Sequence, residues 1–225
     1  MENRITEKTQ GAFLLLLSVA AGCVDALAFI HSGTFPANMT GNSVVLALGV
    51  LHVGPGGASL AALALLGFCG GTVIGALIAR SSKQDTWTPR VSLAFLCAGI
   101  LVLSCSITLW LSSTAFLPYL IVAVSVAMGI QGAAVLQLGV SGVPTTVVTG
   151  ALTTGIARLV GAVRHPQQTH QNYWLPLLSW LAYFTGALIG GFQSLFHTGI
   201  PIVLPGALLV IVAIVAEYYA RRSKG

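Results

Sequence analysis

The feature that most constrains this chain is a succession of apolar stretches near the length of a membrane-spanning helix, with the basic residues almost entirely in the connections between them or at the ends. A helix rises about 1.5 Å per residue and the hydrocarbon layer is about 30 Å thick, so a span needs about 20 apolar residues. Only 7% of the 225 residues are charged and the mean hydropathy is +0.90, whereas soluble domains carry roughly 25% charged residues. These values exclude a water-soluble globular protein and indicate an all-α, polytopic helical membrane protein.

Eight apolar segments can be delimited in the chain. They cover residues 11–30, 40–53, 58–79, 91–111, 116–138, 144–163, 173–196 and 202–219. The second segment is too short to cross a bilayer. The sixth carries several threonines and Arg158, which makes it an unconvincing lipid-facing span. We therefore expect six spans and two broken segments that enter and leave on one side.

The distribution of positive charge favours six crossings over eight. If the N-terminus is cytoplasmic, six crossings place all ten Lys and Arg residues in the cytoplasm, whereas eight crossings leave only seven there. Cytoplasmic connections of membrane proteins carry an excess of Lys and Arg. We therefore expect both termini in the cytoplasm, with segment 40–53 re-entering from outside and segment 144–163 from inside. The net charge of +5 is then a topology signal, and no nucleic-acid partner is expected.

An internal repeat leads to the same architecture. Landmarks of the first half recur in the same order in the second: Gly22 and Gly129, Thr40-Gly41 and Thr149-Gly150, Gly71 and Gly186, Gly75 and Gly190. Three crossings per half force the second copy to be upside down, which predicts an inverted 3+3 repeat. We expect repeats at 11–113 and 114–219, with tails at 1–10 and 220–225. The glycines at four-residue spacing predict close helix packing within one chain, with a homo-oligomer as the alternative.

Three motifs carry a resemblance to a known family. They are Ala21-Gly22-Cys23-Val24-Asp25-Ala26, then Ala37-Asn38-Met39-Thr40-Gly41-Asn42, then residues 143–153 with the sequence VPTTVVTGALT. Through them nearly the whole chain resembles the bacterial YoaK-like membrane protein family, a domain of unknown function (DUF1275). The resemblance implies a six-span bacterial inner-membrane protein in which transport is suspected and no substrate is established.

Asp25 is the first candidate for chemistry, because it is the only acidic residue between Glu7 and Asp85. It stands about fourteen residues into the first span, roughly 20 Å along the helix. A carboxylate at mid-span costs about 2.5–3.5 kcal/mol on insertion scales, so the group should be protonated, paired or in contact with water. We consider two roles: a proton-coupling site with His31 as its candidate partner, or a structural carboxyl that bonds the returning backbone.

The two broken segments begin with residues that cap helices. Asn and Thr side chains accept hydrogen bonds from the free N–H groups of a first turn, so a half-helix should begin near Asn38 and another within residues 144–150. Two such positive helix ends meeting near the midplane would form a polar site. The candidate solute-binding residues are Asn38, Thr40, Asn42, Gln131, Thr145, Thr146 and Thr149. The alternative is that these side chains only satisfy freed backbone groups.

These observations predict a small-solute membrane transporter, proton-coupled through Asp25, whose partners are a small-molecule or ion substrate and the lipid bilayer. The alternatives are a passive channel of the same architecture and a non-transporting membrane scaffold. An enzyme is not expected: Gly139-Val140-Ser141-Gly142 fits the nucleophile motif of rhomboid proteases only weakly, since it falls in a turn before Pro144. The four cysteines lack metal-binding spacing, so no metal and no cofactor are expected.

Overall fold

The computed structural model of the chain describes residues 7–53, 57–80, 87–111, 117–139, 148–164, 173–196 and 203–222. Within these ranges all regular secondary structure is helical. The helices are α1 (Glu7–Ser32), α2 (Met39–Val50), α3 (Ala58–Ala79), α4 (Pro89–Leu111), α5 (Leu117–Leu136), α6 (Val148–Arg164), α7 (Trp174–Phe196) and α8 (Val203–Arg222). The predicted all-α fold is confirmed.

Six of these helices are long and apolar enough to cross a membrane: α1, α3, α4, α5, α7 and α8. Helix α2 has 12 residues, a length of roughly 18 Å, which is well short of the hydrocarbon thickness. Helix α6 has 17 residues, several of them threonine or arginine, and is not among the six. The chain is therefore a multi-pass membrane protein with six candidate spans, as predicted, and both broken segments are short helices.

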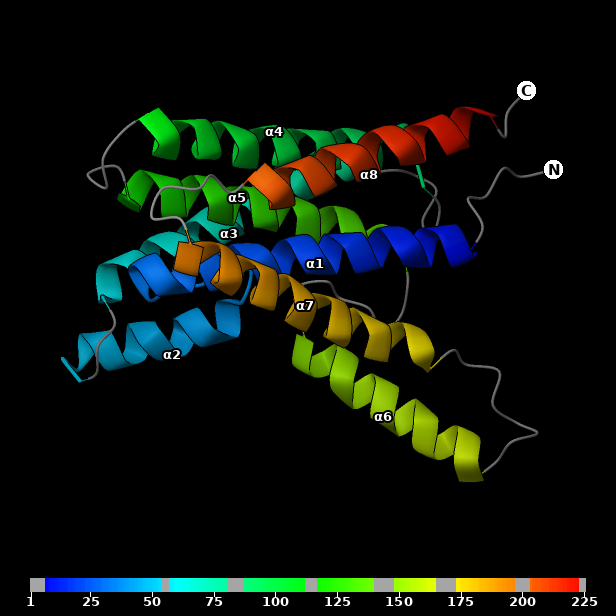
Figure 1. The fold of residues 1–225 in the computed structure, drawn as a ribbon, viewed down its shortest axis with the longest axis horizontal. Helices are drawn as coiled ribbons and strands as arrows, with labels where there is room; N and C mark the ends of the chain where they lie inside the picture. The colour runs from blue at the N-terminus through cyan, green and yellow to red at the C-terminus, as the bar shows by residue number, and fades with distance from the viewer. Residues whose placement is uncertain are drawn as a thin grey trace.

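The helices form three layers, seen edge-on in Figure 1. Helices α4 and α8 pack together on one side, α1, α3, α5 and α7 form the middle, and α2 and α6 lie on the other side. Within the middle layer the most extensive contacts join α1 to α7 and α3 to α5. Helix α2 rests on α3, and α6 rests on α7. Every strong contact of one half thus has a counterpart in the other.

Equivalent helices of the two halves run in opposite directions. In Figure 1 the colours show that α1, α3 and α4 run opposite to α5, α7 and α8, respectively, and both chain ends lie at the same end of the bundle. The predicted glycine pairs also make equivalent contacts: a Cβ on Gly22 would overlap the carbonyl of Tyr183, and one on Gly129 would overlap the carbonyl of Phe68. The arrangement is that of an inverted repeat. The proposed boundary between residues 113 and 114 lies outside the described residues.

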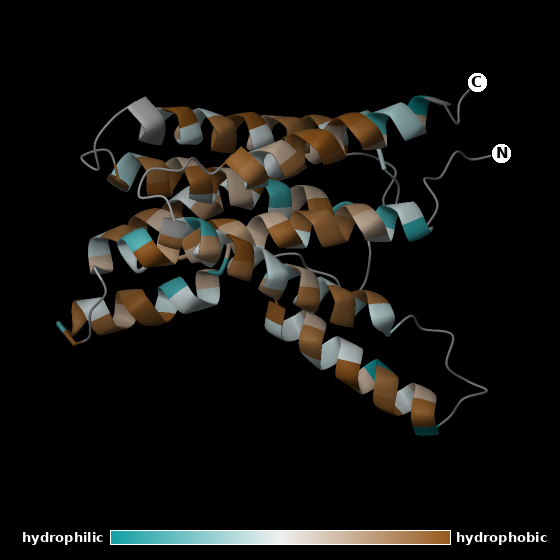
Figure 2. Ribbon diagram, in the orientation of Figure 1, coloured by the Kyte–Doolittle hydropathy of each residue, from teal (hydrophilic) through white to brown (hydrophobic). Residues whose placement is uncertain are grey.

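The outer surface of the bundle is apolar along its length. Figure 2 shows hydrophobic residues along the outward faces of the helices, with hydrophilic ones gathered near the ends of α1 and α8. Large side chains such as Leu66, Leu77 and Ile107 are 70%, 68% and 58% exposed. Soluble proteins seldom expose so much contiguous apolar surface, whereas a bilayer solvates it. The exposed apolar faces are therefore the lipid-contacting faces of the protein.

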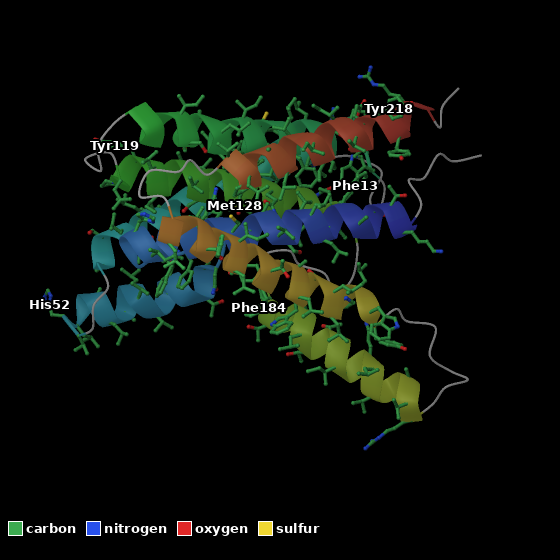
Figure 3. All side chains as sticks on the ribbon, in the orientation of Figure 1. Phe13, His52, Tyr119, Met128, Phe184 and Tyr218 are labelled. Atoms are coloured by element: carbon green, nitrogen blue, oxygen red, sulfur yellow. The ribbon has the colours of Figure 1, made fainter. Side chains whose placement is uncertain are left out.

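The fold predicts which positions share an aqueous phase. His52, after α2, lies at the end of the bundle opposite Tyr218 of α8 (Figure 3), and the N-terminal end of α1 lies with Tyr218. Single cysteines are introduced at His52 and at Lys8 in a variant whose four native cysteines are replaced. A membrane-impermeant thiol reagent should label one of the two positions in intact cells and the other only after the membrane is permeabilised. Labelling of both positions from one side would contradict the six-span arrangement.

Candidate functional site

A re-entrant loop between α1 and α2 builds the candidate site. Helix α1 ends because Gly33 adopts a positive φ of 68°, a conformation that glycine takes without steric cost, and its N–H bonds the carbonyl of Phe29. The chain then turns back, and the N–H of Ala37 donates a 2.7 Å hydrogen bond to Asp25 Oδ1. Asp25 precedes the end of α1 by seven residues, so residues 33–37 return roughly 10 Å into the bundle.

Asp25 joins three parts of the molecule. Its carboxyl is on α1 and only 2% exposed, it accepts from Ala37 of the loop, and it accepts a 2.6 Å hydrogen bond from the hydroxyl of Tyr183 on α7. Tyr183 belongs to the other half of the repeat. Among the residues that the structure describes, no Lys, Arg or His forms an ion pair with Asp25. Without a neighbouring cation, a negative charge on Asp25 would be stabilised by hydrogen bonds alone, which is costly in a low-dielectric interior.

Two asparagines hold the loop and start α2. Asn38 is the N-cap of α2, and its side-chain oxygen accepts from the N–H of Gly41 at 3.2 Å. Asn42 is fully buried; its amide nitrogen donates to the carbonyl of Phe35 at 2.5 Å, and its oxygen accepts from the N–H of Phe35 at 2.8 Å. The side chain of Asn42 thus replaces the backbone partners that an irregular loop lacks. Asn38 and Asn42 were predicted to bind solute, and the structure shows both engaged by backbone.

We expect Asn42→Ala to lower the free energy of unfolding by about 2–4 kcal/mol, because it leaves both backbone groups of the half-buried Phe35 without their partner. The thermal unfolding midpoint of the purified protein in detergent measures this effect. The matched control is Ser43→Ala, since Ser43 is exposed and, among the described residues, its hydroxyl bonds only the Met39 carbonyl of its own helix. Unchanged stability with lost transport would instead favour the solute-binding role for Asn42.

The other predicted site residues are distributed over the bundle. Gln131 of α5 is fully buried and donates to the carbonyl of Leu17 on α1. Thr40 and Thr149 are exposed on the first turns of α2 and α6. His31 is exposed and its Nδ1 lies 2.8 Å from the carbonyl of Leu27 in its own helix, so no described contact connects it to Asp25. Thr145, Thr146 and Ser141 lie outside the described residues.

The two short helices each rest on a neighbouring long helix. Among the described residues α2 and α6 make no extensive contact with each other. The meeting of two helix ends at the midplane therefore stays a prediction. The described residues contain no group of three or more His, Cys, Asp or Glu side chains that could hold a metal ion. Cys23 and Cys105 are buried free thiols, whereas Cys69 is exposed.

Sequence reasoning missed Tyr183, the residue that links Asp25 to the other half. It also missed Ser18 of α1 and Ser179 of α7, whose hydroxyl oxygens lie 2.8 Å apart in the interior. A signal for Tyr183 was present: it stands in the middle of an apolar segment, whereas tyrosines of membrane helices gather at the interfaces. A tyrosine at mid-span needs a hydrogen-bond partner for its hydroxyl.

The fold and the site define a polytopic helical membrane protein whose re-entrant loop is tied to a buried carboxyl. The family model described as "Protein of unknown function (DUF1275)" matches residues 13–215. The chain is also 32% identical over 193 residues to the UPF0700 transmembrane protein YoaK of Bacillus subtilis (strain 168), which covers 80% of this chain and 82% of that protein. The chain therefore belongs to the DUF1275 family, and the resemblance inferred from its motifs is confirmed. No solved structure matches the chain.

Proposed function

We propose that this protein is a small-solute transporter of the bacterial inner membrane, coupled to protons through Asp25. The observation that carries the proposal is the placement of the Asp25 carboxyl, which bonds the re-entrant loop through Ala37 and the opposite half through Tyr183. An ionisable group inside a membrane bundle is a functional candidate by default. Here it lies where a change of its charge acts on both the loop and the contact between the halves.

Proton binding changes what Asp25 can do for its neighbours. The ionised carboxylate is an acceptor only, and hydrogen bonds to it are stronger than hydrogen bonds between neutral groups. Once protonated, it carries an O–H of its own, and its bonds to Ala37 and Tyr183 weaken. A proton thus stabilises one arrangement of the loop over another, which is the differential interaction that coupling requires.

Few other titratable groups face Asp25 from the packed elements. Tyr183 is its neighbour on α7, and Cys23 lies two residues earlier on α1. Tyr119 of α5 and Glu217 of α8 stand near the ends of their helices. We therefore assign the coupling proton to Asp25.

The polar residues near the loop divide into two roles in this proposal. Asn38 and Asn42 support the loop, because their side chains already bond backbone. Thr40 and Thr149, with Thr145 and Thr146, are proposed to contact the solute. Both termini are proposed to be cytoplasmic, following the positive charge near them. We propose no catalytic role for the chain.

Proteoliposomes loaded with a pH-sensitive dye test this function. Under an imposed pH gradient, a panel of small uncharged, anionic and cationic solutes is added to vesicles with and without the protein. A coupled solute should change the internal pH and accumulate against its own gradient, and a protonophore should abolish the accumulation. Solute flux without proton movement would indicate the passive channel. No flux for any solute class would favour the non-transporting scaffold.

A further inference from the structure

Two helix contacts at the centre of the bundle are built alike. We call the α1–α7 contact the first seam and the α3–α5 contact the second seam. In the first, a Cβ on Gly186 would overlap the carbonyl of Val19; in the second, a Cβ on Gly71 would overlap the carbonyl of Val126. The equivalence of the two seams therefore extends to individual backbone contacts, which assigns each position on one seam a counterpart on the other.

The seams differ in the polar groups that they contain. The first seam is crossed by the Tyr183–Asp25 hydrogen bond and by the Ser18–Ser179 hydroxyl pair. The counterparts of Asp25, Tyr183 and Ser179 in the second seam are Gly132, Phe68 and Ala64, whose side chains cannot make such bonds. Ser125, the counterpart of Ser18, is buried, and its hydroxyl has no hydrogen-bond partner among the residues that the structure describes.

This difference changes the free energy that is needed for water to enter each seam. Wetting an apolar seam exposes apolar surface at about 25 cal/mol per Å². Hydroxyl and carboxyl groups exchange their internal hydrogen bonds for bonds to water at a small net cost. The first seam is also tied to the re-entrant loop, because Asp25 bonds Ala37.

We propose that the first seam opens to water during the transport cycle, while the second seam stays closed and holds the two halves together. This inference rests on the proposed function, since it names the helix contact that a proton-driven change would move. The two seams are therefore similar in backbone packing but differ in function. The side chains of Asp25, Tyr183, Ser18 and Ser179 distinguish the seam that opens.

Thiol accessibility at matched positions tests the proposal. Ser18 and Ser125 are both fully buried, and each is replaced by cysteine in separate variants that lack the four native cysteines. A thiol reacts with a maleimide as the thiolate, which needs water, so we expect Ser18→Cys to be labelled at least about tenfold faster than Ser125→Cys in reconstituted protein. Both should react equally after denaturation. Equal rates in the folded protein, or faster labelling at Ser125→Cys, would overturn the proposal.

The labelling experiment needs no transported solute, so the two proposals can fail separately. If Ser18→Cys is labelled fast and Ser125→Cys is protected in a protein that moves no solute, the seam inference is supported and the transport function is contradicted. If solute flux is observed and both cysteines are labelled at equal rates, the transport function is supported and the seam inference is contradicted.

Discussion

Asparagine in place of Asp25 is expected to reduce proton-driven solute accumulation in proteoliposomes to the level of protein-free vesicles. The amide keeps the shape of the carboxyl and an oxygen that can accept from Ala37, so the loop should stay in place. What the variant lacks is the ability to take up and release a proton. The measurement is accumulation of the solute found in the flux screen, under an imposed pH gradient and at equal amounts of reconstituted protein.

Tyr183→Phe is the matched control for this result. It removes one donor to Asp25 but leaves the ionisable group, so uphill accumulation should persist at a lower rate. The lost hydrogen bond to a charged group is worth about 1.5–3 kcal/mol. Uphill accumulation by the Asp25→Asn variant would place the coupling proton elsewhere. Size-exclusion profiles identical to the parent's show that the variants fold.

Alanine in place of Gly22 is expected to lower the yield of folded protein several-fold. The added Cβ would overlap the backbone carbonyl of Tyr183, which cannot move aside unless α1 separates from α7. Overpacking of this kind costs typically about 1–3 kcal/mol or more, a large part of the 5–15 kcal/mol that stabilises most proteins. Gly186→Ala should have the same effect from the opposite helix. Folded yield and the thermal unfolding midpoint in detergent measure both.

Gly70→Ala and Gly191→Ala are the controls, because each glycine neighbours a contact glycine in sequence. Apart from the neighbouring backbone of the same helix, no atom of the described residues lies within 4 Å of a Cβ placed on Gly70 or Gly191. Alanine should therefore be tolerated there, with a gain of up to about 1 kcal/mol from its higher helix propensity. Similar losses at Gly22 and Gly70 would contradict the packing of α1 on α7.

The number of spans could be predicted from the sequence because the bilayer leaves few choices. Every backbone group in the hydrocarbon layer must be bonded within the protein, so long apolar segments form helices. The inverted repeat was also predictable. Gly22 and Gly129 precede short segments in the same order, and three crossings per half turn the second copy upside down. The structure shows why these positions hold glycine: both meet backbone carbonyls of a partner helix.

The candidate site was predicted only in part. Asp25 was expected to be either a proton-coupling site or a structural carboxyl that bonds the returning backbone. The structure shows its bond to the N–H of Ala37, and the coupling role stays a prediction. Asn38 was expected to cap α2, and it does. Asn42 was expected to face a solute, but an amide can serve a ligand or a backbone equally well, and its direction depends on the loop conformation. That conformation directs it to Phe35.

By itself the sequence determined that the chain is a six-span helical protein with two inverted halves, because hydrophobic length and charge placement act locally and need no knowledge of which helices touch. Only the tertiary structure decided that Tyr183 reaches Asp25 and that Ser18 meets Ser179. These pairs join residues about 160 positions apart, and their register is set by how closely the glycine-containing helices approach. The functional asymmetry between the two seams therefore depends on packing, which the order of residues along one helix does not specify.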